Sequence, residues 1–362
     1  MHPAPVDVTF KQSASIRERR NLEFLWLELT NRCNLQCIHC YTESHPQSDG
    51  LDLLTARNYE SIMSQAYALG CRKLQFIGGE PQLNPDFLQL LIKAKTIGFD
   101  FIEVFSNLTR LENDTVRYAA DKGVCFATSV YSDDAPTHDA ITKVRSSHAR
   151  TIRNLKKLID NGIETRAAII VIDQDKAEVE RTKYFLRRLG VRHVREGETR
   201  EFGRGEKILS RRARLSGLCG HCWAGKLCVA PDGETYPCVL ARQWPVGNVL
   251  ESPLSEIVRG EPLDDMRQTI FDTVWLPKIS MKSNDGGGRV GPTALTGSND
   301  CPPSDYPPPE KSPDKSPDES PPPDTEPTPQ CAPCPQSCVP DTTFPPCEPN
   351  PCPMSCGPFH VE

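Results

Sequence analysis

The chain has 362 residues, with 42 lysines and arginines against 48 aspartates and glutamates, so its formal net charge is −6. This acidic balance argues against partners such as nucleic acid or an anionic membrane surface. No apolar run approaches the roughly 18 residues that a transmembrane helix needs. The N-terminus, MHPAPVDVTFKQSASIRERRN, lacks the apolar core of a secretory signal, so we expect a cytoplasmic protein.

Short apolar runs alternate with amphipathic segments through the first half of the chain. The predicted strands cover 24–30, 73–77, 101–107, 124–131, 165–172 and 192–196. The predicted helices cover 55–69, 86–97, 112–122, 149–161 and 175–189. Repeats of strand then helix favour parallel strands joined by right-handed helical crossovers. We therefore predict an α/β fold, a partial (β/α)6 TIM-type barrel, with a doubly wound open sheet as the alternative.

Composition divides the chain further. Residues 280–330 contain few apolar side chains and many Pro, Ser, Asp and Lys, so they cannot bury enough surface to offset chain entropy. The predicted parts are an N-terminal extension over 1–21, the barrel over 22–205, a small Cys-rich domain over 206–275, a disordered Pro-rich linker over 276–330 and a Cys- and Pro-rich tail over 331–362.

The chain has sixteen cysteines, most of them in clusters, which in a chain without a secretory signal indicates metal binding rather than disulfides. Cys33, Cys37 and Cys40 follow the first predicted strand with the spacing C-x3-C-x2-C. Three thiolates suit an iron–sulfur cluster with one iron left open to another ligand. A zinc site with His39 or His45 as the fourth ligand is the alternative.

A second motif, FIGGEP, ends with Gly78, Gly79, Glu80 and Pro81 after the next predicted strand. With these four residues, the three cysteines resemble the radical SAM superfamily. The resemblance implies that the cysteines bind a 4Fe–4S cluster whose fourth iron chelates S-adenosylmethionine (SAM). It also implies that the GGEP segment contacts the methionine amino group, where glycines permit close backbone approach. His39 would take the place of the aromatic residue that usually lies near the adenine in this family.

Loops after the third and fourth strands supply further candidates, because active sites of such barrels lie at the C-terminal ends of the strands. Asn107, Ser129 and Arg145 are the expected SAM contacts, and Ser106, Tyr131 and Ser132 are additional candidates. A loop cap or a solvated charge is the alternative role for each. The segment EFGRGEK is interpreted as a turn that joins the next domain, with a ligand role for Arg204 as the alternative.

A second group of cysteines occupies 219–238, CGHCWAGKLCVAPDGETYPC. The spacing from Cys222 through Gly233 to Cys238 resembles the opening of the SPASM domain, which carries auxiliary 4Fe–4S clusters. The predicted auxiliary-cluster ligands are Cys219, Cys222, Cys228 and Cys238. The Asp-Gly pair predicts a hairpin turn, and a strand and short helix are expected over 246–260. A zinc ribbon is the alternative.

Eight further cysteines fall into two sets. Cys71 and Cys125 are interpreted as packing residues, because free cysteine is often buried. The tail cysteines depart from the SPASM pattern, and their ligand role stays open; they are Cys331, Cys334, Cys338, Cys347, Cys352 and Cys356.

The resemblance implies an enzyme in which a reduced cluster cleaves SAM to a 5′-deoxyadenosyl radical that abstracts hydrogen from a substrate. An external one-electron reductant of the flavodoxin or ferredoxin type would be needed. We expect a ribosomally made peptide as substrate. The 1–21 extension is too short for a fused leader-binding domain, so a separate recognition protein or direct docking is expected. The alternatives are radical tailoring of a small metabolite, such as a sugar or nucleoside natural product, and a zinc-ribbon interaction protein without catalytic activity.

Overall fold

The computed structural model describes residues 21–48 and 52–284, and within them the strands form one continuous sheet. The strand order is β6-β5-β4-β3-β2-β1-β7-β8-β9. The predictions for the N-terminal extension before residue 21, for 285–330 of the Pro-rich linker and for the Cys- and Pro-rich tail over 331–362 lie outside the described residues.

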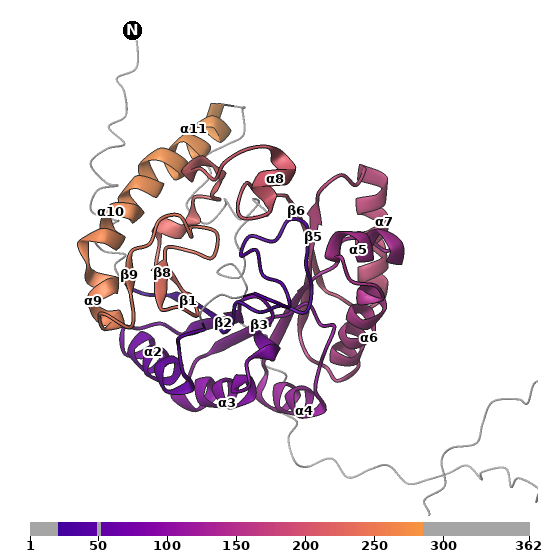
Figure 1. Cartoon of the computed structure of the whole chain (residues 1–362), viewed down its shortest axis with the longest axis horizontal. Helices are drawn as coiled ribbons and strands as arrows, with labels where there is room; N and C mark the ends of the chain where they lie inside the picture. The colour runs from indigo at the N-terminus through magenta and orange to yellow at the C-terminus, as the bar shows by residue number, and fades with distance from the viewer. Residues whose placement is uncertain (1–20, 49–51, 285–362) are drawn as a thin grey trace, which may run out of the picture. The chain divides into compact units, whose positions relative to one another are not determined.

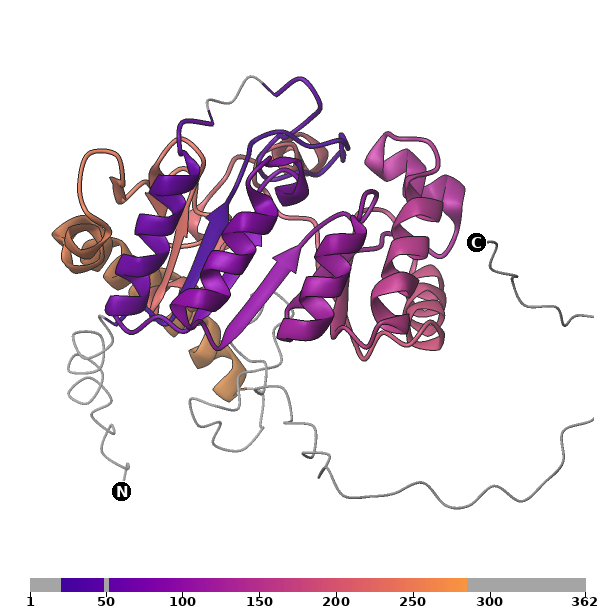
Figure 2. The same cartoon turned by 90° about the horizontal axis from the view of Figure 1, so that it is seen from below.

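The first six strands of the sheet are all parallel to their neighbours. They are β1 (Phe24–Glu28), β2 (Lys73–Ile77), β3 (Phe101–Phe105), β4 (Cys125–Ser129), β5 (Thr165–Val171) and β6 (His193–Glu198). The crossover helices are α2 (Ala56–Ala68), α3 (Phe87–Ile97), α4 (Asn113–Lys122), α5 (Ala135–Thr142), α6 (Ser147–Asp160) and α7 (Lys176–Arg188). Figures 1 and 2 show α2, α3 and α4 side by side on the outer face of the curved sheet. The predicted α/β partial barrel is confirmed.

Local signals set the start of α2. The Thr55 side chain accepts a hydrogen bond from the Asn58 amide, and the Asn58 side chain accepts one from the Thr55 amide, which is a capping box. Two backbone donors that lack partners within the helix are satisfied in this way. The helix that follows covers Ala56–Ala68, in agreement with the predicted N-cap at Thr55.

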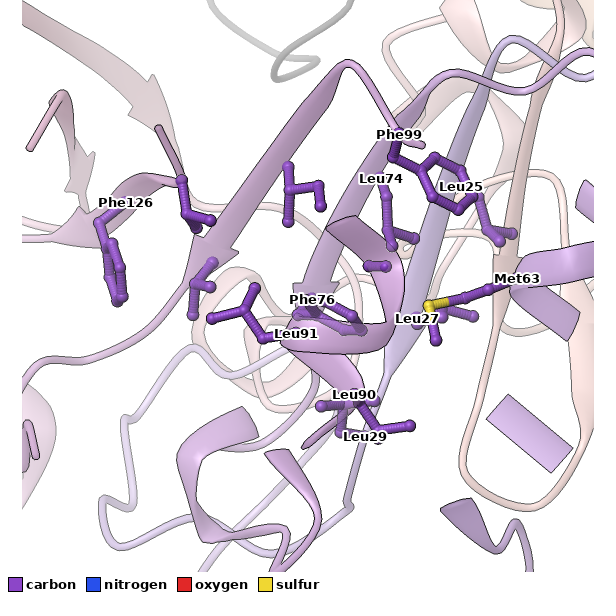
Figure 3. Close-up of a cluster of buried hydrophobic side chains, with 14 of the residues drawn as sticks. Leu25, Leu27, Leu29, Met63, Leu74, Phe76, Leu90, Leu91, Phe99 and Phe126 are labelled. Carbon is purple, nitrogen blue, oxygen red and sulfur yellow. The ribbon is translucent and has the colours of Figure 1, made fainter. Parts of the chain in front are cut away.

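Strand β1 buries both of its faces, because successive side chains point to opposite sides of a sheet. Leu25 and Leu27 pack with Met63 of α2 and Leu90 of α3 in a cluster between sheet and helices (Figure 3). Phe24 and Trp26 point the other way, into a second cluster on the concave side. We call this second group the inner cluster. Fully burying each such side chain contributes roughly 1.5–3 kcal/mol to stability.

The C-terminal part of the described chain extends the same sheet. Strand β7 (Lys226–Val229) pairs parallel with β1, and an antiparallel hairpin joins it to β8 (Glu234–Tyr236). The hairpin turn contains Asp232 and Gly233, as predicted. Strand β9 (Gly247–Asn248) pairs antiparallel with β8.

Helices follow this hairpin and run beyond the predicted start of the linker. They are α9 (Leu254–Arg259), α10 (Glu261–Ile270), a π-helix over Phe271–Trp275 and α11 (Leu276–Asn284). The first 9 residues of the predicted linker, 276–284, are therefore helical. Leu276 packs against the inner cluster, and Lys278 Nζ donates a hydrogen bond of 2.6 Å to the Leu218 carbonyl. Tertiary contacts thus retain this segment in the fold.

Among the described helices, none combines the length and the apolar character that crossing a membrane demands.

Candidate active site

A cavity of about 310 Å³ lies on the concave side of the barrel, where loops follow the parallel strands. Its walls come from the loop after β1, the turn after β2, the ends of β3 and β4, and the inner faces of β5 and β6. This is the expected place for ligand-binding residues on such a barrel. Most of the predicted site residues meet here.

The thiols of Cys33, Cys37 and Cys40 all line the cavity, and none forms a disulfide. Burial raises the pKa of Cys33 far above its usual range and raises that of Cys37 to about 12. Both are therefore neutral thiols without a bound cation, and metal binding would have to release their protons. Nearby donors already face these sulfurs: Asn107 Nδ2 lies 3.7 Å from Cys33 Sγ, and Tyr131 Oη lies 3.8 Å from Cys37 Sγ.

Helix α5 supports the cysteine loop from outside. The amides of Gln36 and Ile38 donate to the carbonyls of Thr142 and Ile141, each at 3.0 Å. This helix was not predicted from the sequence, although Asp134 caps it and proline stands in its first turn. An Asx residue followed by an early proline is a recognised helix start.

His39 lines the cavity beside Tyr131, with ring centroids 5.0 Å apart and planes at 77°. Burial, together with the positive charge of Arg204, lowers the pKa of His39 to about 4. The imidazole is therefore neutral at physiological pH. A neutral aromatic ring in the cavity wall suits contact with a planar ligand group.

The turn after β2 packs tightly on the segment that leads into the cysteine loop. Gly78 and Gly79 line the cavity, and the Gly79 amide donates to the Thr30 carbonyl at 2.8 Å. A Cβ atom added at Gly79 would lie 2.2 Å from the Arg32 carbonyl oxygen. Glycine is therefore required here by the close approach of two backbones.

Glu80 and Pro81 are buried but do not line the cavity. The Glu80 carboxylate accepts hydrogen bonds of 2.8 Å from the Asn107 amide and from Ser106 Oγ. Burial raises the pKa of Glu80 to about 7, against the opposing effect of these hydrogen bonds. In this structure Glu80 fixes the end of β3 and, through it, the position of Asn107.

Only some of the other candidates line the cavity. Asn107, Ser129 and Tyr131 line the cavity, whereas Ser132 is buried and donates to Glu178 Oε1 at 3.0 Å. Arg145 is exposed between α5 and α6 and does not line the cavity, so its expected contact with SAM is not supported.

The arginines that do line the cavity are Arg166, Arg195 and Arg200, none of which was predicted from the sequence. Arg166 stands within an otherwise apolar strand, and a charge in such a place indicates a buried partner. That partner is Glu103, which accepts two hydrogen bonds of 2.7 Å from Arg166.

The second cysteine group reaches the same cavity. Cys219 and Cys238 line it, and Cys222 and Cys228 are fully buried behind them. All four belong to the inner cluster. Cys228 lies opposite Trp26 in the register of β1 and β7, so the pairing of these strands brings the two cysteine groups together.

No three His, Cys, Asp or Glu side chains within 21–48 and 52–284 converge closely enough to share a single metal ion. A 4Fe–4S cluster spreads its thiolate ligands over separate irons. Cysteines that border a cavity, together with a glycine turn, suit such a cluster and an organic ligand beside it.

Comparison with known proteins identifies two domains. A model of the radical SAM superfamily matches residues 27–186, and a model of the iron–sulfur cluster-binding SPASM domain matches residues 209–277. Together these matches cover more than half of the chain.

Two curated relatives align over more than half of this chain. The antilisterial bacteriocin subtilosin biosynthesis protein AlbA of Bacillus subtilis (strain 168) is 24% identical over 265 residues, which are 64% of this chain and 58% of AlbA. The PqqA peptide cyclase of Gluconobacter oxydans (strain 621H) is 26% identical over 321 residues, 76% of this chain and 87% of the cyclase. The chain thus spans little more than half the length of AlbA.

The crystal structure of Streptococcus suis SuiB bound to S-adenosylmethionine has a similar fold, with a TM-score of 0.58, 17% identity and 71% of each chain covered. The two domain matches identify the family: the chain belongs to the radical SAM superfamily and carries a C-terminal SPASM domain.

Proposed function

We propose that this chain is a radical SAM enzyme that matures a ribosomally made peptide, with the reaction in the cavity that both cysteine groups line. The shared cavity is the observation that carries the proposal. Family membership implies a 4Fe–4S cluster, SAM and an auxiliary iron–sulfur cluster. When bound, the first cluster and SAM supply a 5′-deoxyadenosyl radical that removes a hydrogen atom from the substrate.

In this proposal the residues of the chain bind the first cluster and SAM and hold SAM in a defined orientation. Cys33, Cys37 and Cys40 supply three thiolates and leave one iron without a protein ligand, which is where SAM would chelate. The residues proposed to contact SAM are His39, Gly78, Gly79, Asn107 and Ser129, all of which line the cavity. Glu80, with Pro81 beside it, acts indirectly by holding Asn107.

The cavity walls also limit the contact of the reaction with water. Trp26, Ile77, Phe105 and Ile170 give them an apolar surface. An apolar enclosure limits the access of water, which is one of the tasks of the protein in cofactor enzymes.

Cys219, Cys222, Cys228 and Cys238 are proposed as the auxiliary-cluster ligands within the described chain. Anaerobically reconstituted protein should then contain more than the roughly four irons of a single cluster. Cys238→Ser should lower the iron content by about four per chain, because one thiolate of the second cluster is lost. Iron and acid-labile sulfide analysis measures this.

Cys125→Ser is the matched control, since Cys125 is buried but does not line the cavity. An iron content of about four in the unchanged chain, with zinc bound in addition, would instead favour the zinc-ribbon alternative for this domain.

The names of similar proteins support a peptide as the substrate. One is a bacteriocin biosynthesis protein, one is a peptide cyclase, and one is the sporulation killing factor maturation protein SkfB of Bacillus subtilis. SuiB has also been solved bound to the precursor peptide SuiA. We propose that an external flavodoxin- or ferredoxin-type reductant serves this chain and that a separate protein assists peptide recognition.

The test uses reconstituted full-length enzyme with reductant, SAM and a synthetic peptide encoded by the short open reading frame nearest to its gene. We expect 5′-deoxyadenosine to form and the mass of the peptide to change, both measured by mass spectrometry. The Cys37→Ala variant is the control for chemistry that does not depend on the cluster. A peptide that stays unmodified while a sugar or nucleoside is converted would overturn the peptide assignment and support the small-metabolite alternative.

A further inference from the structure

Arg204 lies between β6 and the short helix α8 (Gly205–Leu209), and its side chain reaches back to the cysteine loop. Its Nε donates a hydrogen bond of 2.7 Å to the Cys37 carbonyl. The two terminal nitrogens donate to the carbonyls of Glu43 and Ser44 at 2.7 and 2.8 Å. The Arg204 amide donates to the Cys40 carbonyl at 3.0 Å. One residue thus holds four carbonyls of the loop.

The backbone next to Arg204 also lies directly on the loop. Gly203 has φ +54, and a Cβ atom there would lie 2.5 Å from the Tyr41 carbonyl oxygen and 2.6 Å from that of Cys40. A side chain at this position would therefore push the two segments apart. The contact is not local, because Arg204 and Ser44 are separated by 160 positions in the sequence.

The carbonyls that Arg204 binds belong to irregular backbone rather than to a helix or strand. Backbone carbonyls in such a loop need donors from elsewhere. A guanidinium offers five N–H groups in one rigid plane, so it can bind several carbonyls in a defined arrangement. A lysine ammonium is a compact charge on a flexible chain and cannot reproduce that arrangement.

We propose that Arg204 is a positioning residue that fixes the shape of the cluster-binding loop and holds a permanent positive charge beside the first cluster. The proposal rests on the proposed function, in which this loop binds that cluster. Arg204 lies five positions before the segment matched by the SPASM model, 209–277. Its hydrogen bonds therefore tie the cysteine loop to the part of the chain that leads into the C-terminal domain.

The first test needs no iron. In apoprotein, amide hydrogen exchange over 33–44 should be about tenfold faster in Arg204→Gln and in Arg204→Lys, a change equivalent to the loss of one charge-assisted hydrogen bond. Neither glutamine nor lysine carries the planar guanidinium group that binds several carbonyls at once. Arg211→Gln is the matched control, because Arg211 is an exposed cation of the same segment and should leave the exchange unchanged.

The second test uses reconstituted enzyme. Removing a positive charge next to an iron–sulfur cluster makes its reduction less favourable. The midpoint potential of the first cluster should therefore fall in Arg204→Gln and stay nearer the wild-type value in Arg204→Lys. The electron paramagnetic resonance spectrum of the reduced cluster should change in both variants, because the loop geometry changes in both.

Two results would overturn the proposal. Wild-type exchange over 33–44 in Arg204→Lys would show that the planar fork is not needed, and an unchanged potential in Arg204→Gln would remove the electrostatic role. If α3 and α4 also lose protection in Arg204→Gln, that variant has unfolded, and the lysine variant then decides. Wild-type protein that binds no 4Fe–4S cluster would contradict the proposed function, while the exchange experiment would still test Arg204.

Discussion

Replacing Cys37 by alanine should reduce the formation of 5′-deoxyadenosine from SAM to the background level. Cys37 stands between Cys33 and Cys40 in the sequence, and all three line the cavity. The loss of Cys37 would leave two thiolates for a cluster that needs three from the protein. The measurement is chromatographic quantification of 5′-deoxyadenosine after anaerobic reconstitution and reduction with dithionite. Iron content of the same sample should fall with it.

Cys71→Ala is the matched control for this experiment. Cys71 is fully buried, its Sγ lies 3.3 Å from the Lys73 carbonyl, and it packs in the cluster between sheet and helices, away from the cavity. The control should keep SAM cleavage and lose roughly 0.5–3 kcal/mol of stability, the usual range for a point substitution. SAM cleavage at the wild-type rate by Cys37→Ala would contradict the assignment of the loop.

Arg166→Met should lower the free energy of unfolding by roughly 3–5 kcal/mol, because it leaves a buried carboxylate without its counter-charge. Glu103 is 1% exposed and Arg166 10% exposed, and two hydrogen bonds of 2.7 Å join them. Gln75 donates a further hydrogen bond to Glu103. Such a loss is large beside a typical total stability of about 5–15 kcal/mol.

Denaturant unfolding of the apoprotein measures this effect, and a surface pair provides the control. Arg117 and Asp114 of α4 form an ion pair whose side chains are 77% and 67% exposed. Arg117→Met should change stability by about 1 kcal/mol or less, since solvent screens exposed pairs. Equal effects of the two substitutions would mean that Arg166 contributes no more than a surface charge.

Much of the barrel could be predicted from the sequence because its signals are local. The strand at 73–77 agrees with β2 residue for residue. The third strand was predicted to continue to 107, but β3 ends at Phe105. The Ser106 amide still donates to the Ala127 carbonyl of β4 at 3.0 Å, whereas the Asn107 amide turns to the Glu80 carboxylate. That last contact joins distant residues, and no local pattern reveals it.

In the candidate site, too, local signals could be predicted from the sequence and contacts between distant residues could not. Cys33, Cys37 and Cys40 were found because the spacing of neighbours in the chain carries the signal. The approach of Cys219 and Cys238 to the same cavity was not predicted, since it depends on the pairing of β1 with β7. Arg145 was chosen for its chemistry alone, and the structure exposes it at the turn between α5 and α6.

The position of β7 beside β1 has a consequence for synthesis on the ribosome. Leu25 pairs with Leu74 on one side and with Leu227 on the other. The second partner emerges only after most of the described chain has been translated. Until then β1 presents an apolar strand edge, which is the kind of surface that recruits foreign strands. Nascent chains that stop before 226 should therefore aggregate or depend on chaperones, because β1 then lacks β7 as its partner strand.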